Sequence, residues 1–128
     1  MRHFEQIDAL YQEYGRRLTL YRNRTIGSLT EEDKAMVAET FKAFEAVLGA
    51  VGASKTLHLL APNFFPLWDN AIAKHYKTSI SKQGSNSEHY WQFMNIARRQ
   101  FLGLKGKCSN ILKHIDEYNY CKFTLGLL

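Results

Sequence analysis

Apolar side chains recur along this chain at intervals of three and four residues, which is the spacing of one face of an α-helix. One stripe comprises Phe4, Ile7, Tyr11, Tyr14, Leu18 and Tyr21, and a second comprises Val37, Phe41, Phe44 and Leu48. Thr30 and Asp33 precede the second stripe with the spacing of a capping box, which marks a helix N-terminus. Since no segment sustains the period-two alternation of a half-buried strand, the pattern predicts an all-α fold.

The C-terminal half carries a third stripe that is interrupted by glycine. It comprises Tyr90, Met94, Ala97, Phe101 and Leu104, and it continues in phase through Cys108, Ile111, Ile115 and Tyr118. Gly103 and Gly106 lie between the two parts, and an interior glycine costs a helix about 1 kcal/mol, so we expect two helices or one bent helix. The polar segment 78–87 predicts a loop. The whole chain, residues 1–128, is therefore expected to form a single domain of about five to six helices.

The composition limits the class of protein. With 128 residues and a hydrophobic content of 45%, the chain can form one core. No apolar run approaches the roughly 20 residues of a membrane span, and the N-terminal segment does not resemble a signal peptide. Cys108 and Cys121 have neither metal-binding nor redox spacing, so we expect reduced thiols, no metal, no cofactor and a cytoplasmic location. The net charge of +5 and the isoelectric point near 9.3 are compatible with a polyanionic partner.

Two glycines mark the part of the chain best suited to chemistry. Gly49 and Gly52 lie between two helical patterns, where a residue of positive φ can end one helix and open the next. The first amides of the new helix then lack intrahelical partners, and together with the helix dipole they favour an anion such as phosphate. A Gly-x-x-Gly turn is also an ordinary helix cap, so the hairpin alone does not establish a phosphate site.

The segment after the glycines adds two chemically active side chains. A short apolar helix carries Lys55, and Pro62 is expected to end it. Pro66 suits a turn or the first position of another helix. Asp69 therefore falls at or near a helix N-terminus, where a carboxylate is electrostatically favoured. No other part of the chain combines an anion-binding turn with a candidate nucleophile and a candidate carboxylate.

The motif LGAVG at 48–52, followed by Lys55 and then by FPLWD at 65–69, resembles the helix-hairpin-helix core of the base-excision DNA glycosylases. The similarity covers roughly residues 41–77. In that superfamily a Leu-Pro-Gly-Val-Gly type hairpin opens a helix, and a Val-Pro-Val-Asp type segment presents the catalytic aspartate. Ala50 stands where the family has its first hairpin glycine. Lys55 follows Gly52 by three residues, whereas the family's lysine follows by two.

The resemblance implies roles for individual residues. Asp69 matches the catalytic aspartate, and Lys55 lies near the position of the Schiff-base lysine of bifunctional members. The hairpin amides would hold a DNA phosphate, with further contacts from basic side chains that follow the motif. The expected DNA-binding residues are Gly49, Val51, Gly52, Ser54, His58, Lys74 and Lys77.

Several of these side chains also have a purely structural explanation. His58 can be a partly buried core histidine, and lysines commonly belong to a solvated helix face. Phe64, Phe65 and Trp68 are expected to fill the core unless they prove exposed, in which case they would suit stacking beside an extruded base.

The segment from 115 to 124 is aromatic and partly acidic. Asp116 or Glu117 would be available as a second catalytic acid. The favoured interpretation is instead a solvated helix face, with Tyr118 and Tyr120 covering the core.

Two hypotheses remain open from the sequence. One is a DNA-binding protein that acts as a minimal glycosylase or lyase on a damaged or modified base, with Lys55 as amine nucleophile and Asp69 stabilising the reacting sugar. The other is a non-catalytic helical interaction domain that keeps the scaffold, in which Asp69 simply caps its helix. The family enzymes have two lobes, whereas this chain has room for one, and its apolar stripes would permit a homodimer that supplies the other.

Overall fold

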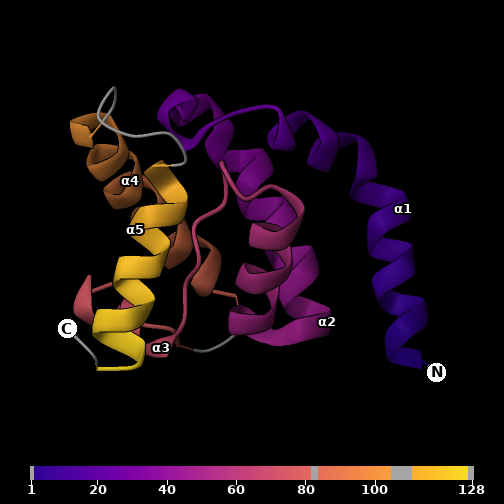
Figure 1. Ribbon diagram of the computed structural model, residues 1–128. Coiled ribbons are helices and arrows are strands. Elements are labelled where there is room, and N and C mark those ends of the chain that lie inside the picture. Colours follow the sequence, from indigo (N-terminus) through magenta and orange to yellow (C-terminus); the bar gives the residue numbers. More distant parts are fainter. Residues whose placement is uncertain (1, 82–83, 105–110, 127–128) are drawn as a thin grey trace.

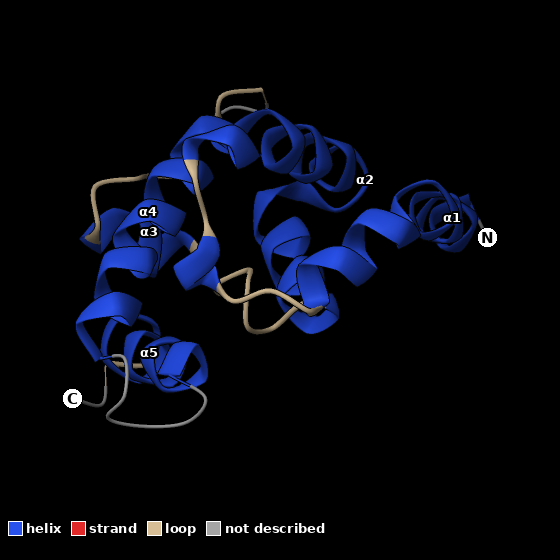
Figure 2. Cartoon of the chain, turned by 90° about the horizontal axis from the view of Figure 1, so that it is seen from above, coloured by secondary structure: helices blue, strands red, loops and turns tan. Residues whose placement is uncertain are grey.

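The computed structural model describes residues 2–81, 84–104 and 111–126, and this part of the chain is all-helical (Figure 1). The α-helices are α1 (Arg2–Arg22), α2 (Lys34–Leu60), α3 (Asn70–His75), α4 (Asn86–Leu104) and α5 (Ile111–Asn119). Short helical turns η1 (Ile26–Ser28), η2 (Glu31–Asp33) and the π-helical η3 (Tyr120–Thr124) complete the order. Figure 2 contains no strand among these residues. The predicted all-α fold is confirmed, and the interrupted third stripe forms two helices.

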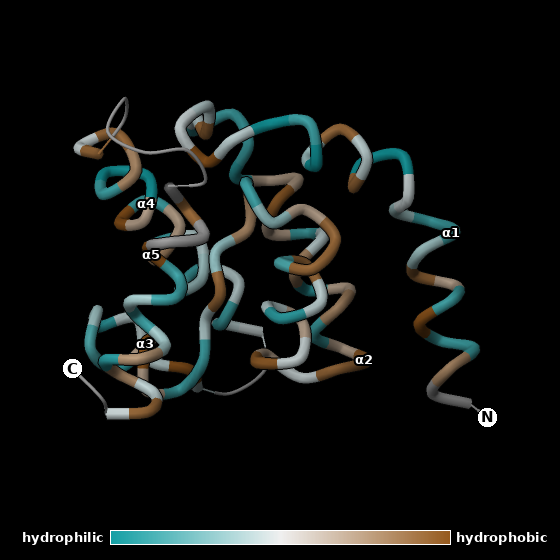
Figure 3. The backbone as a smooth tube through the Cα atoms, in the orientation of Figure 1, coloured by the Kyte–Doolittle hydropathy of each residue, from teal (hydrophilic) through white to brown (hydrophobic). Residues whose placement is uncertain are grey.

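Helix α1 packs against the core from Leu10 onward. Leu10, Tyr14, Leu18 and Tyr21 are buried. Phe4 and Tyr11, which were expected on the buried face, are 69% and 50% exposed. The N-terminal half of α1 stands apart from the other helices in Figures 1 and 2, and Figure 3 shows apolar positions along it. The predicted stripe is therefore wrong for this half, because α1 extends past the core.

The start of α2 is fixed by the predicted capping box. The amide of Thr30 donates to a carboxylate oxygen of Asp33 over 2.9 Å, which satisfies a backbone donor at the helix start. Arg24 binds both oxygens of the same carboxylate at 2.8 Å each. These hydrogen bonds lower the pKa of Asp33 below its ordinary value. The regular α-helix follows at Lys34.

Helix α2 is broken at Gly49, where the predicted turn lies. Gly49 has φ 76° and ψ 171°, a conformation open almost only to glycine. The chain turns back at this point in Figure 1, which divides α2 into the segments 34–48 and 50–60. A Cβ atom placed on Gly52 would lie 2.9 Å from the Cβ of Leu48, so the second glycine permits close approach across the turn.

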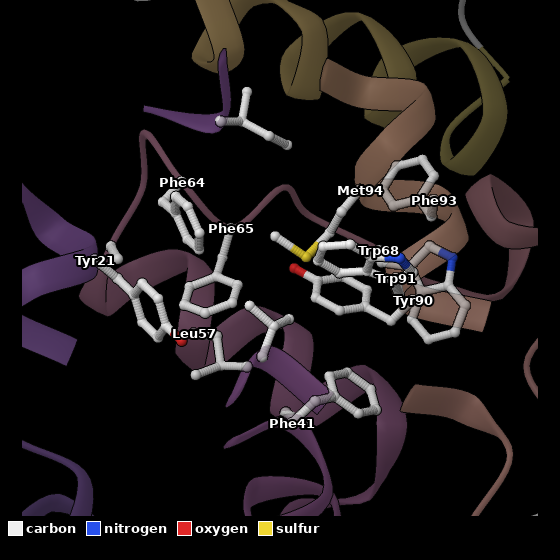
Figure 4. Packing of buried hydrophobic residues seen from close by; sticks show 14 of the residues in the cluster. Tyr21, Phe41, Leu57, Phe64, Phe65, Trp68, Tyr90, Trp91, Phe93 and Met94 are labelled. Carbon is white, nitrogen blue, oxygen red and sulfur yellow. The ribbon is translucent and has the colours of Figure 1, made fainter. Parts of the chain in front are cut away.

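Aromatic rings from α2, the 61–69 segment and α4 meet in the core (Figure 4). Tyr90 packs between Phe41 and Trp68, with ring centroids at 4.8 Å and 5.3 Å. Phe64, Phe65 and Trp68 are fully buried. Their expected role as core residues is confirmed, and they are not exposed for stacking on a base.

Replacing Gly49 with alanine is expected to lower the free energy of unfolding by about 1–3 kcal/mol, because alanine cannot adopt this backbone conformation without strain. The matched control is Gly15→Ala in α1, where an added Cβ meets nothing within 4 Å. Since alanine favours a helix more than glycine does, the control should be neutral or stabilising. Urea denaturation measures both, and a Gly49→Ala protein as stable as the wild type would contradict the turn.

Candidate functional site

The segment between α2 and α3 is held by the polar side chains and backbone around it. Helix α2 ends at Leu60, as the position of Pro62 predicts, and the Leu60 carbonyl accepts from Arg22 Nε over 3.0 Å. The amide of Ile26 donates to the Asn63 carbonyl over 2.8 Å. Because these contacts come from the α1 end and from η1, the segment has a fixed course despite lacking regular structure.

The residues just before Asp69 are anchored inside the core. The amide of Trp68 donates to Ser54 Oγ over 2.8 Å, and the Trp68 indole donates to Thr78 Oγ1 over 3.1 Å. The hydroxyl of Tyr90 donates to the Pro66 carbonyl over 2.7 Å. All of these residues are buried. A buried hydrogen bond is costly to lose, so the end of the segment is rigidly placed.

Asp69 is the N-cap of α3, as its position in the sequence predicts. Its Oδ1 accepts from the Ile72 amide over 2.9 Å, and its Oδ2 accepts from Thr124 Oγ1 over 2.6 Å. The side chain is half-buried. Both oxygens therefore have a partner, one from the helix that the residue caps and one from η3 at the other end of the chain.

The segments that carry Lys55 and Asp69 are joined by one hydrogen bond. Ser54 precedes Lys55 and Trp68 precedes Asp69, so the bond between Ser54 and Trp68 joins the two segments at this point. The Lys55 side chain is exposed and forms no ion pair with a described residue. Successive helical residues point about 100° apart. The position that faces the Asp69 segment, two residues after Gly52, is thus occupied by Ser54 rather than by lysine.

The other expected DNA-contact residues divide into two groups. Gly49 is exposed and Val51 and Gly52 are half-buried at the start of the second segment of α2. The first-turn amides of that segment have no carbonyl four residues back within it. Lys74 and Lys77 are exposed on and just beyond α3. Ser54 is different, because its side chain is buried and its hydroxyl accepts from Trp68.

His58 also turns inward, toward the same segment. Its Nδ1 lies 2.9 Å from the Phe65 carbonyl oxygen and 3.4 Å from Asp116 Oδ2. A carbonyl can only accept, so this nitrogen carries the proton. Asp116 Oδ1 accepts from the Leu67 amide over 3.3 Å. His58 and Asp116 therefore bind the backbone on both sides of Pro66.

The expected solvated face of α5 is wrong for Asp116, which is only 4% exposed. Tyr118 and Tyr120, expected over the core, are 48% and 38% exposed. Among the α5 residues whose burial is described, Leu112, Ile115, Asp116 and Asn119 are buried. Their spacing of three and four residues was visible in the sequence, but it includes two polar residues and so does not look like a core face. Glu117 is exposed, and its proposed catalytic role stays untested.

The buried carboxyl of Asp116 has unusual electrostatics. Burial raises its pKa to about 8, and the negative charge of Glu117 adds to the shift, although the Leu67 amide opposes it. A pocket of about 260 Å³ adjoins this group and is lined by His58, Leu67, Asp116, Glu117, Tyr120 and Cys121. The site thus holds a carboxyl that remains largely protonated near neutral pH, beside an imidazole whose Nδ1 donates to the Phe65 carbonyl.

Cys121 is a free thiol, and Cys108 lies outside the described residues. Within the described ranges, no three His, Cys, Asp or Glu side chains are grouped to hold a metal ion. None of the described helices combines the length and apolarity needed to cross a membrane. Searches with protein-family models, curated proteins and solved structures gave no match to this chain.

The protonated state of Asp116 predicts that stability falls as pH rises. The folded-state pKa is about 8, whereas an unfolded aspartate has a pKa of ~3.9. Between these two pH values the folded protein keeps a proton on Asp116 that the unfolded chain releases, so rising pH favours unfolding. Asp116→Asn cannot titrate. Relative to the wild type it should gain stability from about pH 4 to about pH 8, by up to about 1.4 kcal/mol per pH unit, and gain no more above that.

Urea denaturation at a series of pH values measures this difference. Asp8→Asn, which removes an exposed carboxylate from α1, is the control and should show no such trend. A stability difference between Asp116→Asn and the wild type that stays constant from about pH 4 to about pH 8 would contradict a buried carboxyl that keeps its proton in the folded protein.

Proposed function

We propose that this protein is a DNA-binding domain that presents the Gly49 turn, Lys55 and Asp69 to the nucleic acid. The observation that carries the proposal is the hydrogen bond from the Trp68 amide to Ser54 Oγ, 2.8 Å long. It joins the helical segment that follows the turn to the residue before the α3 N-cap. By resemblance to the glycosylases, the first of these segments would hold the phosphate and the second would present the catalytic aspartate.

Phosphate binding at the turn follows from the backbone. Gly49 interrupts α2, so the segment 50–60 begins with amides that lack intrahelical partners and with the positive end of a helix dipole. Such an end favours an anion. The exposed Lys55 ammonium lies one turn further along and adds positive charge. The protein's net charge of +5 would favour approach to a polyanion.

Lys55 suits the role of a phosphate contact better than that of a nucleophile. A Schiff-base amine must be partly neutral near pH 7, which requires burial or a nearby positive charge. Lys55 is exposed, and His58 turns toward Phe65 and Asp116 instead. The second candidate function that we propose is therefore a glycosylase that uses water as its nucleophile. Asp69 would be its catalytic carboxylate, because this residue is only half-buried at the N-terminus of α3.

A protein-interaction domain is the alternative that another observation favours. The N-terminal half of α1 presents Phe4 and Tyr11 to solvent, and Leu20 and Leu59 are 65% and 79% exposed. Exposed apolar side chains on α1 and α2 would suit a protein partner or a second copy of the chain. Salt-dependent DNA binding separates this alternative from the main proposal, because apolar association is not weakened by salt.

Binding to a DNA duplex is expected to weaken as salt rises, with log affinity falling by about 0.9 per log unit of salt for each phosphate neutralised. Lys55→Gln should lower the slope of log affinity against log salt by about 0.9, the value for one phosphate contact. Lys42→Gln removes an exposed lysine from the first segment of α2 and is the matched control. Fluorescence anisotropy measures all three proteins. Absent or salt-independent binding by the wild type would contradict the DNA proposal, and equal losses in both variants would contradict the role of Lys55.

Asp69→Asn should separate helix capping from chemistry. Asparagine caps a helix about as well as aspartate, so the melting temperature should stay near that of the wild type. The amide lacks the charge and basicity of the carboxylate, so release of a damaged base from DNA should be lost. Assays on duplexes with single modified bases test this. Base release that persists in Asp69→Asn would exclude Asp69 as the catalytic carboxylate.

A further inference from the structure

Lys77 occupies a backbone position that usually belongs to glycine. It has φ 59° and is the one residue with positive φ, glycines aside, in the described part of the chain. Helix α3 ends in a Schellman motif, in which the Thr78 amide donates to Ala73 O over 2.8 Å and the Lys77 amide donates to Lys74 O over 3.2 Å. Lys77 stands at the left-handed position of this motif, where glycine would avoid the strain.

The strained backbone places Lys77 at the edge of a polar groove. The groove has a volume of about 410 Å³ and lies between the start of α2, the end of α3 and one face of α4. Thr78, Trp91 and Arg99 also line it. Trp91 and Thr78 are buried, so they form a fixed part of the groove wall. Lys77 and Arg99 are both exposed.

The charges in the groove leave these two cations available. Lys34 and Glu88, which also line it, pair with each other at 3.2 Å. Lys77 and Arg99 have no ion-pair partner among the described residues, and Glu31 is the remaining acidic residue of the lining. Three cations and two carboxylates give the groove a net charge of +1. The cations of the lining that have no ion-pair partner are therefore Lys77, just after α3, and Arg99 on α4.

We propose that this groove is a second phosphate-binding site, in which Lys77 and Arg99 contact the backbone of the nucleic acid that the Gly49 turn binds. The inference rests on the proposed DNA-binding function. An arginine guanidinium offers paired donors to phosphate oxygens, and a lysine supplies a compact charge beside it. This role explains why lysine occupies a position that favours glycine. The lysine strains the backbone, but it places a cation in the groove.

The proposal requires opposite effects of one substitution on stability and on binding. Lys77→Gly relieves the left-handed strain, so its melting temperature should rise above that of the wild type. The same change removes a phosphate contact, so the steepness of log DNA affinity against log salt should fall by about 0.9. Lys77→Asn is the second variant, because asparagine tolerates this conformation while lacking the charge. Arg99→Gln should lower the salt dependence by a similar amount.

The controls distinguish this proposal from the proposed function. Lys42→Asn, on α2 and outside the groove lining, should leave more of the affinity in place than Lys77→Asn does. If the wild type binds DNA with a steep salt dependence but Lys77→Gly, Lys77→Asn and Arg99→Gln match the Lys42 control, the groove proposal is overturned and the DNA-binding function stands.

A separate measurement tests the groove when DNA does not bind. Titration with inorganic tripolyphosphate, followed by amide NMR shifts, should move the signals of Lys77, Thr78 and Arg99 in the wild type and not in Lys77→Asn. If these shifts occur but the protein does not bind DNA, the groove is an anion-binding site and the proposed DNA-binding function is overturned. No shifts at these residues would overturn the groove proposal.

Discussion

The seating of Trp68 in the core is the constraint on which the rest of the candidate site depends. Its ring packs against Tyr90 and Phe41, its indole donates to Thr78, and its amide donates to Ser54. The contacts come from both segments of α2, from α4 and from the residues after α3, so Trp68 is fixed in both position and orientation. Because Asp69 follows Trp68 directly in the chain, the position of Trp68 also determines the position of the α3 N-cap. The segment between α2 and α3 is therefore a structural part of the core rather than a connection across the surface.

A polar pair supports the same segment from the other side. Asp116 and His58 hold the backbone at Leu67 and Phe65, and the carboxyl is kept largely protonated by burial. Removing one member of a buried polar pair leaves the other member without its hydrogen-bond partner, so such pairs are costly to disrupt. The arrangement links α5 to the position of Asp69, and Thr124 adds a further link from η3. The C-terminal elements thus act on the candidate site although they lie far from it in sequence.

Local patterns predicted the parts of the fold that local interactions determine. The capping box at Thr30 and Asp33, the turn at Gly49, the helix end before Pro62 and the N-cap at Asp69 each depend on a few neighbouring residues, and all are present. The failures depend on distant contacts. The stripe of α1 does not reveal that the core ends near Leu10. The polar Asp116 does not look buried until its partners, 49 and 58 positions away from it at Leu67 and His58, are known to meet it.

The central claim is that the Ser54 hydroxyl holds the Trp68 amide and thereby positions the segment that ends at Asp69. Hydrogen exchange of the Trp68 amide tests this claim directly, because a buried and bonded amide exchanges only when the structure opens. We expect slow exchange in the wild type, and much faster exchange at Trp68 and Ile72 in Ser54→Ala, with the amides of the first segment of α2 little changed. Rapid exchange of Trp68 in the wild type, or exchange unaffected by Ser54→Ala, would contradict the account.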